Sequence, residues 1–240
     1  MLLESFLMVT TKKRGKLIVI EGTDGSGKTT QYKLLLRRLK QEKIPFARLD
    51  FPQYEKPSSY FIRKYLNGDY GGWEKVGPYR ASIFYALDRF DVKPKIEQWL
   101  HEGKTVIADR YVASNMGHQG AQIASSKERK AYFRWLHKLE YQILGIPRPD
   151  MTIVLHVPGT FVKKMIDKRR RISGIQGGMK RDILEADLKH LHQAERVYKE
   201  TVKLFPRDFR MIECMKGKKF AGMEEIHEKV WTMVSGVIRA

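Results

Sequence analysis

The segment Gly22–Thr29, which reads GTDGSGKT, constrains this chain more than any other feature. It fits the pattern G-x-x-x-x-G-K-[ST]. The apolar, β-branched run 17–20 before it indicates a buried strand, and apolar residues at helical spacing over 32–39 follow it. Such a strand, turn and helix start direct backbone N–H groups at a phosphate. The sequence therefore predicts a phosphate site made of Gly22, Asp24, Gly25, Ser26, Gly27, Lys28, Thr29 and Thr30.

Two residues of this loop are expected to have different roles in binding a nucleotide. Lys28 is expected to reach the β- and γ-phosphates of a nucleoside triphosphate, and the hydroxyl of Thr29 is expected to ligate Mg²⁺. A chance match of a glycine turn is the alternative, and the strand and helix on either side argue against it. The sequence thus predicts an enzyme that binds nucleotide phosphates.

Strands and helices alternate along the whole chain, which predicts an α/β fold of the P-loop NTPase type. Five apolar runs (17–20, 46–51, 105–108, 151–157 and 209–212) predict a five-stranded parallel sheet covered by helices on both faces. We expect one domain over 15–240, after an N-terminal extension, 1–14, that is predicted to be disordered. Met8 is an alternative start. Near 169–182 the chain becomes rich in arginine and glycine and loses its apolar period, which predicts a mobile lid.

The composition limits the cellular compartment and the classes of binding partner that we expect for this chain. The formal net charge of +19 suits binding of phosphorylated substrates, but no zinc finger or RNA-binding signature accompanies it, so specific nucleic-acid binding is not expected. No apolar run is long enough for a membrane span. The chain has one cysteine, Cys214, in a strand-like context, which predicts a thiol near the core. We expect a cytoplasmic location, because one cysteine excludes an internal disulfide.

A second anion site is indicated at the end of the third predicted strand. Asp109-Arg110-Tyr111 follows this strand at the same sheet edge as the glycine-rich loop, and Arg89 lies on the preceding helix. Guanidinium groups match phosphate oxygens in a bidentate fork. Either arginine alone is also compatible with an ion pair or a surface position, and Asp109 with a turn or helix cap.

Taken together, these motifs resemble the thymidylate kinase family of nucleoside-monophosphate kinases. The resemblance rests on Gly22–Thr29 and on segments that follow in family order over nearly the whole chain. These are Phe51-Pro52, the unit Tyr85 to Arg89, Asp109-Arg110-Tyr111 with Ser114-Asn115, Gln119-Gly120, and Pro147 to Asp150. It implies transfer of the γ-phosphoryl group of ATP to dTMP, with Mg²⁺ as cofactor, by a homodimer.

The resemblance also implies roles for individual residues. The dTMP site would comprise Asp24, Phe51, Tyr85, Arg89, Arg110, Ser114, Asn115 and His118. Within it, Arg89 and Arg110 would hold the phosphate, Tyr85 (or Phe84, one position earlier) would stack on thymine, and Asn115 would bind the base. Asp24 would lie near the 3′-hydroxyl of dTMP. Thr29 and Asp109 would bind the metal. The catalytic residues would be Lys28, Arg110, Arg169, Arg170 and Arg171.

Two departures from the family pattern affect these expectations. Gln53 and Tyr54 follow Phe51-Pro52, where many members have an arginine that contacts the monophosphate; Arg48 or Lys56 would need to rearrange to compensate. His118 stands where a tyrosine associated with exclusion of a 2′-hydroxyl is frequent, so selection for deoxyribose is less certain. The loop itself holds no arginine, so the arginines 169–171 of the lid are the candidates for stabilising the group in transfer.

Two other functions fit parts of the sequence. A deoxynucleoside kinase shares the loop and an arginine at a strand end, and Glu55 lies near the place of its general base. A basic P-loop ATPase associated with nucleic acid is the third possibility, although it does not explain the second anion site.

Overall fold

The computed structural model describes residues 13–23, 25–162 and 188–240. A five-stranded parallel sheet with the order β2-β3-β1-β4-β5 lies at its centre. Its strands are β1 (Leu17–Glu21), β2 (Phe46–Asp50), β3 (Thr105–Asp109), β4 (Met151–His156) and β5 (Phe209–Glu213). These are the five strands that the apolar runs predict, and the predicted parallel sheet is confirmed.

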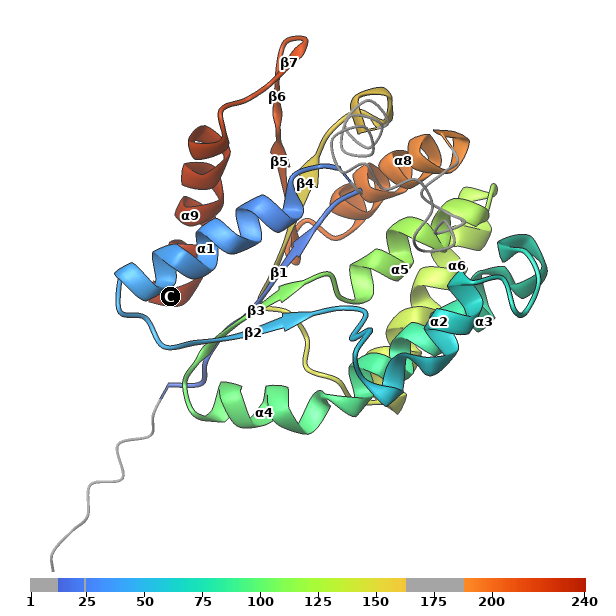
Figure 1. Cartoon of the computed structure of the whole chain (residues 1–240), viewed down its shortest axis with the longest axis horizontal. Coiled ribbons are helices and arrows are strands. Elements are labelled where there is room, and N and C mark those ends of the chain that lie inside the picture. The colour runs from blue at the N-terminus through green and yellow to red at the C-terminus, as the bar shows by residue number, and fades with distance from the viewer. Residues whose placement is uncertain (1–12, 24, 163–187) are drawn as a thin grey trace, which may run out of the picture.

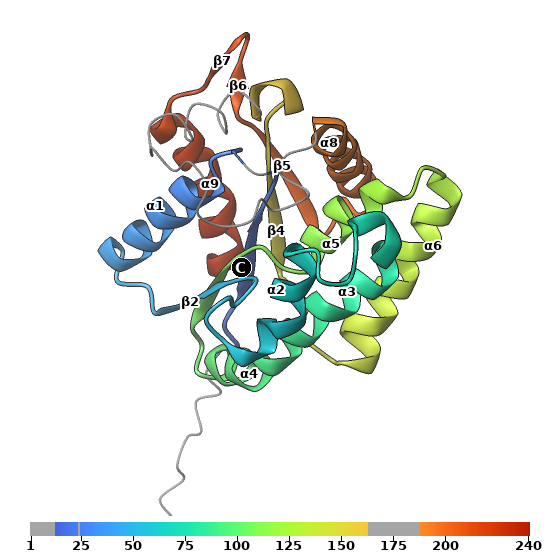
Figure 2. The ribbon, with the colours of Figure 1, turned by 45° about the vertical axis from the view of Figure 1, so that its right-hand side comes forward.

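Helices cover both faces of the sheet (Figures 1 and 2). Side chains of β1 alternate between two apolar cores: Leu17 and Val19 belong to one, and Ile18 and Ile20 to the other. This alternation explains why the strand is apolar throughout rather than at every second position. The second core is covered by α1 (Lys28–Gln41) and α9 (Met223–Arg239). The first is covered by α4 (Lys93–His101), α5 (Val112–His118), α6 (Ser126–His137) and the buried side of α8 (Leu188–Leu204).

The remaining described elements are shorter or irregular. They are η1 (Pro57–Ser59), α2 (Tyr60–Leu66), α3 (Trp73–Asp91), η2 (Gly120–Gln122), the π-helical η3 (Lys138–Ile143), β6 (Met215–Lys216) and β7 (Lys219–Phe220). β6 and β7 pair as an antiparallel hairpin, which projects from the end of β5 (Figure 1). α3 contains a kink at Gly77, whose φ of 73° only glycine adopts readily.

The sheet brings the predicted site residues to one edge. Asp50 and Asp109 end two adjacent strands and are register partners, while Glu21 ends β1 directly before the glycine-rich loop. Ligands of open α/β sheets bind at this carboxyl edge. Within the part of the chain that the structure describes, no helix is both long and apolar enough to cross a bilayer. Cys214 is a fully buried free thiol, as its sequence context predicts.

Candidate active site

The glycine-rich loop has the backbone that the motif requires. Gly22, Gly25 and Gly27 have φ values of 141°, 79° and 92°, in the region that favours glycine. A Cβ at Gly22 would lie 2.5 Å from the carbonyl oxygen of Leu155, so this position excludes larger residues for steric reasons as well. α1 begins at Lys28, whose buried Nζ donates to the carbonyl oxygen of Thr23 at 2.9 Å. The loop and the helix start are therefore confirmed, and Asp24 lies outside the described residues.

Two carboxylates lie beside this loop at the ends of β2 and β3. Asp50 is exposed on one side, but partial desolvation of its carboxyl group and the neighbouring charge of Asp109 raise its pKa from 3.8 to about 6, although Arg110 and Lys28 act in the opposite direction. Repulsion of this kind is relieved by a bound cation, and carboxylate and hydroxyl oxygens are the ligands that Mg²⁺ prefers. Among the described residues, no group of three or more Asp, Glu, His or Cys side chains could hold a metal ion by itself. Asp109 and Thr29 thus fit Mg²⁺, with Asp50 as an unpredicted neighbour.

The seven predicted dTMP-site residues that the structure describes line one pocket. They are Phe51, Tyr85, Arg89, Arg110, Ser114, Asn115 and His118. They come from the ends of β2 and β3 and from α3 and α5, so segments far apart in sequence converge. The aromatic alternatives are separated by geometry, because Tyr85 lines the pocket whereas Phe84 stacks on Phe61 at 5.7 Å between ring centroids.

Arg110 has a strained backbone and a histidine partner. Its φ of 70° lies in the left-handed region, which a residue with a Cβ rarely adopts. Its Nη1 lies 3.3 Å from Nε2 of His118. Because guanidinium only donates, Nε2 of His118 acts as the acceptor in this contact. The ring of His118 also stacks on His190 of α8 at 5.8 Å between centroids.

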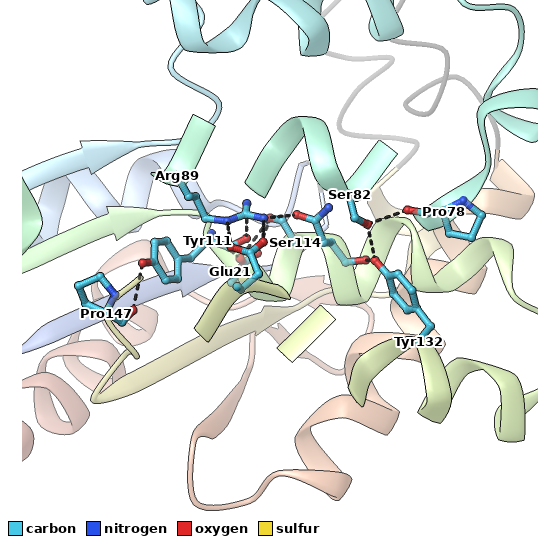
Figure 3. Close-up of polar contacts among 10 residues, drawn as sticks. Glu21, Pro78, Ser82, Arg89, Tyr111, Ser114, Tyr132 and Pro147 are labelled. Atoms are coloured by element: carbon cyan, nitrogen blue, oxygen red, sulfur yellow. Dashed lines mark hydrogen bonds and ion pairs between the residues drawn. The ribbon is translucent and has the colours of Figure 1, made fainter. Parts of the chain in front are cut away.

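Arg89 is in a different environment from Arg110, and Figure 3 shows the polar contacts around Arg89. Its side chain is 2% exposed and forms an ion pair with the fully buried Glu140. Its Nη2 also donates to Oδ1 of Asn115 at 2.8 Å, and its Nη1 donates to the carbonyl oxygen of Tyr111 at 3.4 Å. The charge of Arg89 is therefore already balanced inside the protein, which is the ion-pair alternative left open for this residue, with Glu140 as a partner that was not predicted.

Several residues of the site were not predicted as site residues from the sequence. Glu21 is fully buried and accepts hydrogen bonds from Tyr111, Ser114 and Tyr198 (Figure 3 labels Glu21, Tyr111 and Ser114). The signal that was available is its acidic side chain at the end of an otherwise apolar strand. His190 and Tyr54 line the pocket and had no recognisable motif.

The residues considered as replacements for the missing family arginine are placed elsewhere. Gln53 is bonded to Asp88, which accepts from its backbone N–H at 2.8 Å. Arg48 and Lys56 are exposed and do not line the pocket. Glu55, the candidate base of a nucleoside kinase, is likewise exposed and away from the pocket lining. The arginines 169–171, the lid over 169–182 and residues 1–12 lie outside the described residues.

Comparison with known proteins gives the family of the chain. The thymidylate kinase family model matches residues 20–225. The chain is 30% identical to the thymidylate kinase of Mycobacterium tuberculosis over 185 residues, which cover 77% of this chain and 84% of the relative. It is 29% identical to a probable thymidylate kinase of Pyrococcus horikoshii over 222 residues, which cover 92% and 96%.

A solved structure extends the agreement to the fold. The thymidylate kinase of Candida albicans has a TM-score of 0.71 and 21% identity, over 93% of this chain and 92% of the other. The sheet order, the phosphate loop and the family match lead to one conclusion. The chain belongs to the thymidylate kinase family, whose members phosphorylate dTMP to dTDP with ATP.

Proposed function

We propose that the pocket lined by Tyr85, Arg110 and Asn115 binds dTMP and that the loop before α1 binds ATP with Mg²⁺. The observation that carries this proposal is the convergence of seven predicted residues on one pocket at the sheet edge that also carries Lys28. A phosphoryl group can pass directly between two nucleotides only when both bind in one cleft. The pocket and the glycine-rich loop lie at the same edge of the sheet, which supports this arrangement.

The two arginines of the pocket have different proposed tasks. Arg110 holds the phosphate, because its guanidinium lines the pocket, where its Nη1 contacts the ring of His118. Arg89 was expected to share this task. Its bonds to Glu140 and Asn115 instead support a role at the base, where it orients the amide of Asn115.

The orientation of Asn115 favours a pyrimidine carbonyl group. Because Arg89 can only donate, it fixes Oδ1 of Asn115 toward itself. Nδ2 of Asn115 then remains as a buried donor without a protein partner among the described residues. A carbonyl oxygen of thymine satisfies this donor, whereas an amino group at the same place, as in cytosine, does not. Uracil carries the same carbonyl groups, so we expect partial activity with dUMP.

The reaction needs positioning and charge neutralisation more than proton transfer. The acceptor is an ionised phosphate oxygen, so no strong general base is required. Mg²⁺ held by Thr29 and Asp109 would supply charge neutralisation at the ATP phosphates. Lys28 orients the γ-phosphate once it exchanges its bond to Thr23, and Arg110 reduces repulsion between the two anions. The arginines 169–171 remain the candidates for stabilising the group in transfer.

We also propose that the enzyme is a homodimer that associates through α2 and α3. Four apolar residues of α3, at positions 79, 83, 87 and 90, recur at helical spacing, and all are about two-fifths exposed. Tyr60 and Phe61 of α2 are exposed to a similar degree. A continuous apolar face of this kind marks an interface. A Leu87→Glu variant should sediment as a monomer, and a native chain that is monomeric at micromolar concentration would contradict the dimer.

The activity is tested by offering ATP with Mg²⁺ to a panel of acceptors. Diphosphate formation should be fastest with dTMP, slower with dUMP and absent with dCMP, whereas thymidine should give no product. Product from thymidine in place of dTMP would support the nucleoside kinase instead. ATP hydrolysis stimulated by DNA, and sensitive to salt, would support the nucleic-acid ATPase. A cytoplasmic location is proposed from the buried free thiol of Cys214.

A further inference from the structure

Glu21 occupies a position where a charged side chain is costly. It ends the central strand β1, directly before the phosphate loop, and it is 0% exposed. Burial raises the pKa of its carboxyl group, while Arg110, the bond from Tyr111, the bond from Ser114 and Lys28 oppose that shift. A buried carboxylate is tolerated when hydrogen bonds and nearby positive charges compensate its loss of hydration.

The contacts of Glu21 connect three separate segments. Oε1 accepts from the backbone N–H of Tyr111 at 2.8 Å, and Oε2 accepts from the hydroxyls of Ser114 at 2.9 Å and Tyr198 at 3.0 Å. Tyr111 and Ser114 belong to the segment that follows β3, and Tyr198 belongs to α8. The bond from Ser114 means that this hydroxyl, which was expected in the dTMP site, is already engaged.

The bond to Tyr111 falls beside the strained residue. The N–H of Arg110 donates to the carbonyl oxygen of Ile20 at 3.0 Å, and the next N–H along the chain donates to Glu21. The last two residues of β1 therefore hold the N–H groups of both Arg110 and the residue after it. A left-handed conformation at a residue with a Cβ persists where surrounding bonds determine it. This backbone conformation determines where the guanidinium of Arg110 enters the pocket.

We infer that Glu21 is a positioning residue for the acceptor phosphate: by holding the N–H of Tyr111, it fixes the turn that directs Arg110 into the dTMP pocket. This inference rests on the proposed role of Arg110. It assigns to Glu21 an effect that depends on the reach of its side chain, not on its charge. The alternative is that the negative charge of Glu21 matters by itself, because it lies close enough to act on both Arg110 and Lys28.

Two conservative variants separate reach from charge. Glu21→Gln keeps the length and an oxygen for the N–H of Tyr111, but has no charge. Glu21→Asp keeps the charge, but withdraws the carboxylate by one carbon–carbon bond. Binding of dTMP and of thymidine to the full chain is measured by calorimetry for both variants and the native enzyme. Thymidine lacks the phosphate, so it reports on the pocket without Arg110.

The expected order follows from the cost of leaving a buried N–H unsatisfied. Glu21→Asp should weaken dTMP binding about tenfold and Glu21→Gln less than about threefold, while thymidine binding stays within about twofold of native for both. Equal loss in both variants, a larger loss in Glu21→Gln, no loss in either, or a parallel loss of thymidine binding would each overturn the inference. Arg110→Ala tests the underlying role separately: if it leaves dTMP binding intact, the proposed role of Arg110 fails, and the inference for Glu21 fails with it. If Arg110→Ala weakens dTMP binding but Glu21→Asp does not, only the inference for Glu21 fails.

Discussion

The buried pair of Arg89 and Glu140 gives the sharpest test of how this site is held. The exposed fractions of the two side chains are 2% and 0%, so water cannot screen the charge of either one if the other is removed. We consider Glu140→Gln, which changes the volume little and keeps one oxygen for the guanidinium. After the change, Arg89 retains acceptors in Asn115 and Tyr111 but loses its counter-charge.

The size of the effect follows from the burial. Breaking a buried pair by removing one charge costs about 3–5 kcal/mol, because the remaining charge is left uncompensated. For a domain of this length, about 1 kcal/mol shifts the Tm by about 2–4 °C, so we expect a decrease of about 6–20 °C. Replacing both partners, as Arg89→Met with Glu140→Leu, should restore much of the loss, because no buried charge remains.

The assay is urea unfolding of the ligand-free chain, followed by far-UV circular dichroism, with Tm as a second measure. Glu97→Gln is the matched control, because Glu97 pairs with Lys93 at 3.8 Å and both are partly exposed. That change should cost less than about 1 kcal/mol, as surface pairs do. If Glu140→Gln costs no more than Glu97→Gln, or if the double variant is less stable than Glu140→Gln alone, the reasoning is refuted.

Three further predictions concern the reaction and its charges. Lys28→Met should reduce kcat by at least about 100-fold in a coupled diphosphate assay, because it removes the donor that is proposed to bind the transferred group. It should leave calorimetric dTMP binding unchanged, and a matching loss of dTMP affinity would contradict the role of Lys28. Arg170→Ala should lower kcat far more than substrate affinity, and unchanged kcat in alanine variants of all three residues 169–171 would remove the lid from catalysis. The pKa of Asp50 is raised to about 6, so the ligand-free folded state binds more protons than the unfolded state between 3.8 and about 6, and stability falls as pH rises through this window. Asp50→Asn should therefore raise the Tm at pH 8 and have little effect at pH 4, and equal shifts at both pH values would contradict the repulsion from Asp109.

The sheet and the phosphate loop were predictable because their signals are local. Each strand is an apolar run between polar or glycine-bearing segments, and the loop motif combines a strand, a turn and a helix start in consecutive residues. The position of Arg110 at the sheet edge followed from sequence as well, because parallel strands place their carboxyl ends at one edge. Tyr85 and Asn115 were placed beside it only by the family resemblance. The residue-level roles that the resemblance implied remain proposals.

Two elements were missed because tertiary packing determines them. α5 contains Asn115 and Gly117, which are weak helix formers. Gly117 is nevertheless required, because a Cβ there would lie 2.4 Å from the ring of Tyr198 in α8. The hairpin of β6 and β7 has a turn at Gly217, with a φ of 61°. Each of its strands has only two residues, so no apolar run predicts the hairpin.

The pocket shows why a motif alone cannot assign the work of an arginine. Arg89 lies on a helix before β3, and Arg110 follows β3 directly. From the sequence, either arginine could bind a phosphate. Glu140, which decides between them, is 51 positions from Arg89 and carries no motif of its own. Because Arg89 is paired and buried, its guanidinium is a fixed donor that orders Asn115, whereas the fork of Arg110 lines the pocket where an anion can replace its contact with His118. Lysine has no planar fork, so under the proposed roles Arg→Lys would remove a different function at each position: the order of the base site at 89, and bidentate phosphate binding at 110.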